Sequence, residues 1–132
     1  MRRQGEFIRK RGHPEQILQQ MLVRWLDAKN ILFVASMVGG INLGRRVGGI
    51  RKSMGCRAGV HDIIILQPAG GLHGMTLELK VKGGKVTDEQ IDFWHKSLNR
   101  GYHSMIMPPE FEVPEALTWA IKAIERYLTG KK

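Results

Sequence analysis

The 132-residue chain contains a single cysteine, Cys56, and only 7% aromatic residues. One cysteine excludes an intramolecular disulfide and a cysteine-rich zinc site. The longest apolar stretch, Ile31 to Val38, is far shorter than the ~20 residues that a membrane-spanning helix requires. Met1 to Gly12 is basic and has no apolar run of the kind that a signal peptide needs. We therefore expect a cytoplasmic protein that has no membrane partner.

Acidic residues are scarce relative to basic ones. Twelve Asp and Glu face 21 Lys and Arg, which gives a net charge of +9 and a pI of about 10.1. Such an excess attracts polyanions, so it favours nucleic acid or an acidic membrane surface as a partner and predicts salt-sensitive binding. The plain alternative is a basic, soluble domain without a polyanionic partner.

The length suits one domain. Residues 1–12 are rich in Arg and Lys, and we expect them to form a basic N-terminal arm ahead of a single domain over residues 13–130. Hydrophobic periodicity and turn residues predict the elements of that domain. We expect helices from Pro14, from Thr87 to Gly101 and from Pro114 to Gly130, the first and last of them with an apolar stripe along one face, and strands at 31–35, 63–66, 75–82 and 102–107. This order predicts an α/β fold with a central mixed β-sheet flanked by helices.

Two of these helices carry polar residues of interest. On the first helix, Glu15 precedes Leu18 by three residues and Leu22 by seven, so it projects toward the buried side. The second helix opens with a capping box, in which Thr87 is followed three residues later by Gln90. We expect its core face to consist of Ile91, Trp94 and Leu98, with Gly101 as its C-terminal cap.

The 22 residues from Val38 to Gly59 include seven glycines and no acidic residue. Long loops of this kind are uncommon in compact domains unless they are functional or disordered. We expect a loop that grips backbone phosphates through its five cationic side chains: Arg45, Arg46, Arg51, Lys52 and Arg57.

Residues 75–82 alternate as a strand does, which puts Glu78 and Lys80 on one face. Antiparallel pairing with the preceding strand would bring Asp62 beside Glu78. Two carboxylates about 4 Å apart repel by roughly 4 kcal/mol at an effective dielectric of about 20, and a divalent cation removes that cost. Oxygen ligands select Mg²⁺, Mn²⁺ or Ca²⁺, and a neighbouring lysine completes a site for phosphodiester hydrolysis. The alternative is a solvated strand face with a ladder of charges, because Glu-x-Lys arises readily by chance.

The residues around these positions resemble the VRR-NUC family, a branch of the restriction-endonuclease-like PD-(D/E)xK nucleases. The resemblance covers nearly the whole chain, and its motifs fall in the family's order. They are Glu15 with Gln19, Gly59-Val60-His61-Asp62, Leu77-Glu78-Leu79-Lys80, Gly83-Gly84-Lys85-Val86-Thr87-Asp88-Glu89-Gln90, and Gly101-Tyr102.

The resemblance implies a set of roles. Asp62, Glu78 and the backbone carbonyl of Leu79 would bind Mg²⁺, for which Mn²⁺ would substitute, and Glu15 would reach the metal directly or through water. Lys80 would position the nucleophile. Gln90 is either a further catalytic residue or only a helix cap. No motif for a nucleotide cofactor is present.

His61 departs from the family pattern, which usually has proline at this position. It is either a neutral substitution at the start of a strand or a second proton-transfer group or outer ligand.

The resemblance implies a Mg²⁺-dependent endodeoxyribonuclease, of the stand-alone type found in bacteria and phages, that acts as a homodimer on branched DNA such as Holliday junctions or flaps. Lys82 and Lys85 would join the five cations of the 38–59 segment in binding DNA. Two alternatives remain open: a non-catalytic DNA-binding module on the same fold, and an RNase with the same metal chemistry.

Overall fold

The computed structural model describes residues 13–36 and 44–130, so the expected basic arm lies outside the described residues. The elements in chain order are α2 (His13–Ala28), β1 (Phe33–Ala35), α3 (Gly44–Ser53), β2 (Ile63–Ile65), β3 (Met75–Glu78), α4 (Asp88–Leu98), β4 (His103–Ile106) and α5 (Val113–Leu128). The strands form one sheet in the order β1-β2-β3-β4, with the first two pairings antiparallel and the last parallel. The predicted α/β class and the mixed sheet are confirmed.

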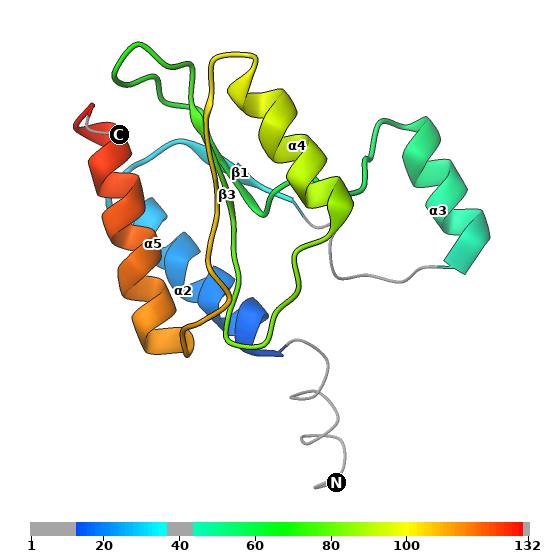
Figure 1. Ribbon diagram of the computed structural model, residues 1–132, viewed down its shortest axis with the longest axis horizontal. Coiled ribbons are helices and arrows are strands. Elements are labelled where there is room, and N and C mark those ends of the chain that lie inside the picture. Colours follow the sequence, from blue (N-terminus) through cyan, green and yellow to red (C-terminus); the bar gives the residue numbers. More distant parts are fainter. Residues whose placement is uncertain (1–12, 37–43, 131–132) are drawn as a thin grey trace, which may run out of the picture.

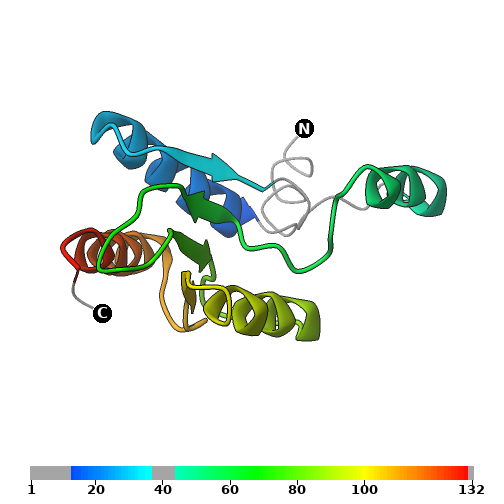
Figure 2. The same ribbon diagram turned by 90° about the horizontal axis from the view of Figure 1, so that it is seen from above.

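Helices cover both faces of the sheet. Helices α2 and α5 lie side by side on one face, and α4 packs on the other face against β3 and β4 (Figures 1 and 2). The apolar core fills the layer between the sheet and the α2–α5 pair. Its fully buried members include Leu18, Leu22, Leu26, Ile63, Ile65, Met75, Leu77, Ala116, Ala120 and Ile124. The apolar stripes that the sequence predicts for α2 and α5 are therefore confirmed.

The pairing of β2 with β3 sets the geometry of the candidate site. The two strands are antiparallel and Ile63 lies opposite Leu77. Continued by one residue, this register places Asp62 opposite Glu78. The pairing expected from the sequence is confirmed.

Strand β3 is shorter than the expected strand at 75–82, because it ends at Glu78. Its second face is also not solvated. Thr76, Glu78 and Lys80 are only 3%, 4% and 5% exposed, respectively. The interpretation of this segment as a solvent-facing charge ladder is wrong, because α4 covers the face that the polar side chains occupy.

Helix α4 begins as predicted but packs through a different side. Thr87 and Gln90 form both hydrogen bonds of the capping box. Ile91 and Leu98, expected in the core, are 39% and 40% exposed, whereas Ser97 is buried. Of the expected core face only Trp94 packs on the sheet: it is half-buried, and its Nε1 donates to the carbonyl of Ser104 at 2.8 Å. Polar Ser97 is buried on this side because the sheet face beneath α4 carries hydroxyl and charged groups. Gly101 ends the helix as predicted: its φ is +90°, and the backbone N–H groups of Gly101 and Tyr102 donate to the carbonyls of Leu98 and Ser97, as in a Schellman cap.

The segment expected as a loop from Val38 to Gly59 contains helix α3, so that expectation is wrong over Gly44–Ser53. Cationic side chains stabilise its C-terminal end, where carbonyl groups lack helical partners. The Nη1 of Arg57 donates to the carbonyl of Lys52 at 2.7 Å. The helix projects away from the sheet (Figures 1 and 2).

None of the helices in the described ranges is long and apolar enough to cross a membrane.

Gly59 allows a close approach between the segment leading into β2 and the first turn of α4. Its φ is +87°, and an added Cβ would collide with the backbone carbonyl of Glu89. Both the backbone conformation and the space therefore require glycine at this position.

We expect Gly59→Ala to lower the free energy of unfolding by about 2 kcal/mol or more, because it adds left-handed backbone strain to a steric clash. Chemical denaturation measures the decrease. Gly49→Ala is the matched control, since Gly49 lies in α3 and an added Cβ there meets no atom within 4 Å. Equal stability of the two variants would contradict this account of Gly59.

Candidate active site

The carboxylates of Asp62 and Glu78 come together at the end of the β2–β3 ladder. Asp62 Oδ2 accepts a hydrogen bond from the backbone N–H of Leu79 at 2.9 Å, which fixes Asp62 against β3. Glu78 Oε1 is fully buried and has no hydrogen-bond donor among the described residues. An acceptor left without a donor in the interior is costly, so this oxygen is a candidate ligand for a cation.

Lys80 is the cation nearest to this pair. Its Nζ donates to the carbonyl of Lys85 at 2.7 Å and lies 3.5 Å from Glu78 Oε2. Because the carbonyl of Lys85 holds the ammonium group, the turn after β3 orients Lys80 toward the carboxylates. No sequence motif points to this contact, since it uses only the backbone of Lys85.

Gln90 joins the helix cap to the carboxylate pair. Its Oε1 accepts from the backbone N–H of Thr87 at 3.0 Å, and its Nε2 donates to Glu78 Oε2 at 3.0 Å. The cap occupies the amide oxygen and therefore leaves the NH₂ group to face Glu78. The two roles that the sequence offered for Gln90 are thus compatible, because one side chain makes both contacts.

Glu15 approaches the site from the first turn of α2. Its pKa is raised by burial, and the charges of Lys80 and Asp62 act on it in opposite directions. A Cβ on Gly84 would lie only 3.0 Å from Glu15 Oε2 and 3.3 Å from Lys80 Cδ. Glycine at position 84 therefore leaves room for Glu15 and Lys80 to approach each other.

Burial has the largest effect on the electrostatics of the site. Burial raises the pKa of Asp62. Burial and the nearby Asp62 charge raise the pKa of Glu78 to about 8, despite the opposing effect of Lys80. Without a bound cation, a proton on Glu78 relieves the repulsion between the two carboxylates.

The donor set fits a divalent cation that prefers oxygen. Asp62 and Glu78 supply carboxylate oxygens, and the Leu79 carbonyl accepts no hydrogen bond from any described residue. Mg²⁺ and Mn²⁺ bind such ligands and retain several waters. Within residues 13–36 and 44–130, no three His, Cys, Asp or Glu side chains are grouped closely enough to hold a metal. Glu15 therefore fits a contact through water better than direct ligation.

His61 is fully buried under the start of α4. Its Nε2 lies 3.1 Å from the carbonyl of Gln90, so Nε2 carries the proton and donates it. Its Nδ1 then accepts from the Thr76 hydroxyl at 3.0 Å, and that hydroxyl is bonded in turn to Ser104. Burial lowers the pKa of His61. With both ring nitrogens engaged away from the carboxylates, this placement favours a structural role over proton transfer.

Two hydroxyl residues of this network were not singled out from the sequence. Thr76 shares the face of β3 that carries Glu78, and Ser104 lies opposite Thr76 on β4. Strand alternation provides a signal for Thr76, but Ser104 becomes visible only through the parallel pairing of β3 with β4.

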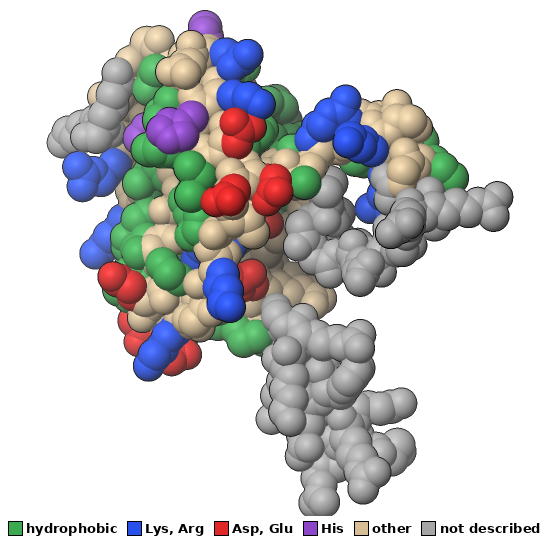
Figure 3. All heavy atoms as spheres, turned by 45° about the vertical axis from the view of Figure 1, so that its right-hand side comes forward, with side chains coloured by type: hydrophobic (Ala, Val, Ile, Leu, Met, Phe, Trp, Pro, Cys, Tyr) green, Lys and Arg blue, Asp and Glu red, His purple; other side chains and the backbone are tan. Residues whose placement is uncertain are grey.

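The proposed DNA-binding cations lie mostly apart from the carboxylates. Lys52, Arg57, Lys82 and Lys85 are exposed and Arg51 is half-buried, whereas the side chains of Arg45 and Arg46 lie outside the described set. Lys82 approaches Glu112 at 4.0 Å, and both side chains are 70% exposed. Lys and Arg side chains also gather on the projecting α3 region (Figure 3).

The fold resembles a solved structure described as "VRR_NUC domain protein". The two share 20% sequence identity with a TM-score of 0.68, and the likeness covers 89% of this chain and 93% of that one. No protein-family model and no curated protein matches the sequence. The fold predicted from the motifs is therefore confirmed.

We expect the metal-free protein to lose stability as the pH rises from about 4.5, the ordinary pKa of Glu78, to about 8, its pKa in the folded state. Over this interval the folded state binds the extra proton, so the free energy of unfolding falls with pH. Below pH 4.5 both states are protonated and the full stability is present.

Chemical denaturation in EDTA between pH 4.5 and 9 measures this slope. Glu78→Gln removes the titrating group, so the difference between wild type and variant isolates it from His61, whose lowered pKa acts in the opposite direction. A pH-independent difference would show that Glu78 does not titrate in this range.

Proposed function

We propose that this protein is a metal-dependent nuclease that hydrolyses phosphodiester bonds in DNA, with Asp62, Glu78 and Lys80 at its active site. The observation that carries the proposal is the carboxylate pair of half-buried Asp62 and buried Glu78 beside a buried lysine; Glu78 has a pKa of about 8 and an oxygen without a donor among the described residues. A site with this excess of negative charge is suited to a divalent cation.

Asp62, Glu78 and the Leu79 carbonyl would hold Mg²⁺, with Mn²⁺ as a substitute and Glu15 acting through water. The bound cation supplies Lewis-acid stabilisation of charge on the phosphate and lowers the pKa of water. Lys80 orients the attacking water or a phosphate oxygen, since Lys85 and Glu78 hold its ammonium group in place. Gln90 positions Glu78 by donating to its Oε2.

The site bears on the two alternatives that the sequence left open, a non-catalytic DNA-binding module and an RNase. A module that only binds DNA gains nothing from two acids beside the phosphate, so the carboxylate pair favours an enzyme. RNA and DNA present the same phosphate to the metal. DNA is favoured because the similar solved structure is described as a VRR_NUC domain protein and the motif resemblance implies a deoxyribonuclease.

The cationic segment around α3 extends the proposal to the substrate. Arg51, Lys52 and Arg57 would contact backbone phosphates, together with Arg45, Arg46, Lys82 and Lys85. Such contacts position the protein without reading sequence, so selection would follow DNA shape, as at a Holliday junction or a flap. A homodimer would present two sites to two strands.

We expect purified wild-type protein to cleave branched DNA in Mg²⁺ or Mn²⁺ and to be inactive in EDTA. Asp62→Asn and Lys80→Met should each lower the cleavage rate by roughly 10²-fold or more, because each removes charge aimed at the reacting phosphate. Gel assays on linear duplex, single strand, flap and four-way junction measure the rate and the preference. Lys122→Ala, on the exposed side of α5, is the control that should retain activity. Binding without cleavage of any substrate in either metal would refute the enzyme proposal.

We expect Arg51→Ala with Lys52→Ala to weaken binding to all DNA substrates alike, because phosphate contacts carry no sequence information. The slope of the logarithm of the DNA association constant against the logarithm of the salt concentration should become shallower by about 1 for each phosphate that the variant no longer neutralises. Fluorescence anisotropy in EDTA measures both quantities, and Lys122→Ala is again the control. An unchanged slope would remove α3 from the DNA interface.

A further inference from the structure

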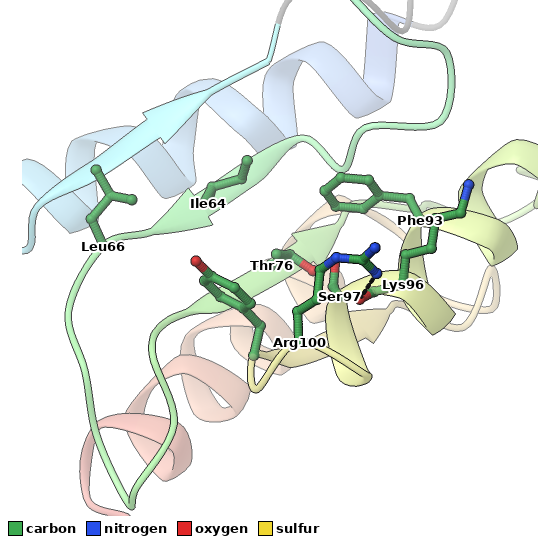
Figure 4. Close-up of a pocket in the computed structure, with 8 residues that line it drawn as sticks. Ile64, Leu66, Thr76, Phe93, Lys96, Ser97 and Arg100 are labelled. Atoms are coloured by element: carbon green, nitrogen blue, oxygen red, sulfur yellow. Dashed lines mark hydrogen bonds between the residues drawn. The ribbon is translucent and has the colours of Figure 1, made fainter.

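A pocket of about 470 Å³ adjoins the candidate active site on the face of the sheet that α4 partly covers. Ile64 projects from β2 and Leu66 lies just beyond it, facing the side of α4 that carries Phe93 (Figure 4). The volume falls within the range of about 300–1,000 Å³ typical of small-molecule sites. The pocket therefore has room for a planar ring system.

The lining combines apolar and aromatic surface with positive charge. Phe93 and Tyr102 contribute aromatic rings, and Lys96 and Arg100 contribute the cations. Lys96 forms an ion pair with Asp92 at 2.7 Å, which offsets part of its charge. Arg100 Nη1 donates to the Lys96 carbonyl at 3.0 Å, and no carboxylate of the described residues forms an ion pair with Arg100. Aromatic and apolar surface beside cations is how proteins hold unpaired bases of nucleic acids.

The position of the pocket relates it to the carboxylates. Thr76 forms part of the pocket wall and precedes Glu78 by two residues on the same face of β3. Two residues of a strand advance about 6.6 Å, a distance that one nucleotide of an extended strand spans. Phe93 also packs edge-on against His61, with ring centroids 4.8 Å apart. The pocket and the candidate active site thus share one strand and one buried network.

We propose that this pocket binds an unpaired nucleobase of the nucleic acid strand whose phosphate occupies the site at Glu78, with the guanidinium group of Arg100 against the base. The inference rests on the proposed nuclease function and deepens it. A base can enter the pocket only when it is unstacked and unpaired, so the pocket selects strands at branches, flaps and gaps over intact duplex.

Metal-free binding tests the pocket separately from cleavage. Two branched DNA duplexes of otherwise identical sequence are compared in EDTA. One has a single unpaired nucleotide beside the branch, and the other has an abasic site at that position. The phosphates are identical, so only the base differs. We expect the base to strengthen binding about 5- to 100-fold, which corresponds to the ~1–3 kcal/mol typical of stacking on protein side chains.

Two variants of pocket residues test whether the contribution of the base to binding arises in the pocket. Arg100→Glu and Leu66→Glu should each abolish the difference between the two duplexes. Arg126→Glu, which makes the same charge change on the exposed side of α5, should weaken both duplexes equally and keep the difference. Thermal denaturation checks that each variant is folded, and 2-aminopurine at the unpaired position reports stacking directly through quenching.

Equal binding of the two duplexes by wild type would overturn the inference, even if cleavage assays support the nuclease. A base preference that persists in Arg100→Glu and Leu66→Glu would also overturn it. Conversion of a wild-type dimer to a monomer by Leu66→Glu in light scattering would assign the surface to a second copy of the chain instead. Base-dependent binding without cleavage would support the pocket and refute the proposed nuclease.

Discussion

The close approach of half-buried Asp62 to the buried carboxylate of Glu78 is the constraint on which the rest of the site depends. Asp62 and Glu78 meet because the β2–β3 register places them opposite each other, and α4 shields them from water. Desolvation, followed by repulsion from Asp62, raises the pKa of Glu78 to about 8, and Lys80 opposes only part of this effect. The chain tolerates this cost because hydrogen bonds from Leu79 and Gln90 hold the carboxylates in place.

Helix α4 connects this site to the fold through polar contacts. Its capping box fixes the amide of Gln90, and His61 donates to the carbonyl of the same residue. Beneath it, the hydroxyls of Thr76 and Ser104 continue the network across β3 and β4. Buried polar networks of this kind define one arrangement when every member is satisfied. The position of Glu78 is thereby coupled to three strands and a helix.

The two faces of the sheet therefore have different roles. The face toward α2 and α5 is an apolar core that stabilises the fold. The opposite face carries the carboxylates, the buried lysine and the pocket beside Phe93. Because α4 covers β3 and β4 but leaves Leu66 and Val34 47% and 49% exposed, apolar surface remains available next to the charged site. Binding chemistry and folding stability are thus separated by the sheet itself.

The sequence by itself determined the α/β class, the stripes of α2 and α5, the capping box and the approach of Asp62 to Glu78. Each of these depends on local periodicity, on side chains at fixed spacing or on pairing between consecutive strands. It misassigned the segment containing α3 and the buried side of α4, because seven glycines outweighed the helical signal and α4 packs against a polar surface. Only the tertiary structure decided that Lys80 is buried on the Lys85 carbonyl and that Gln90 reaches Glu78. Both contacts depend on how the turn after β3 and the first turn of α4 fold back over the strand, and residue spacing along the chain carries no information about that path.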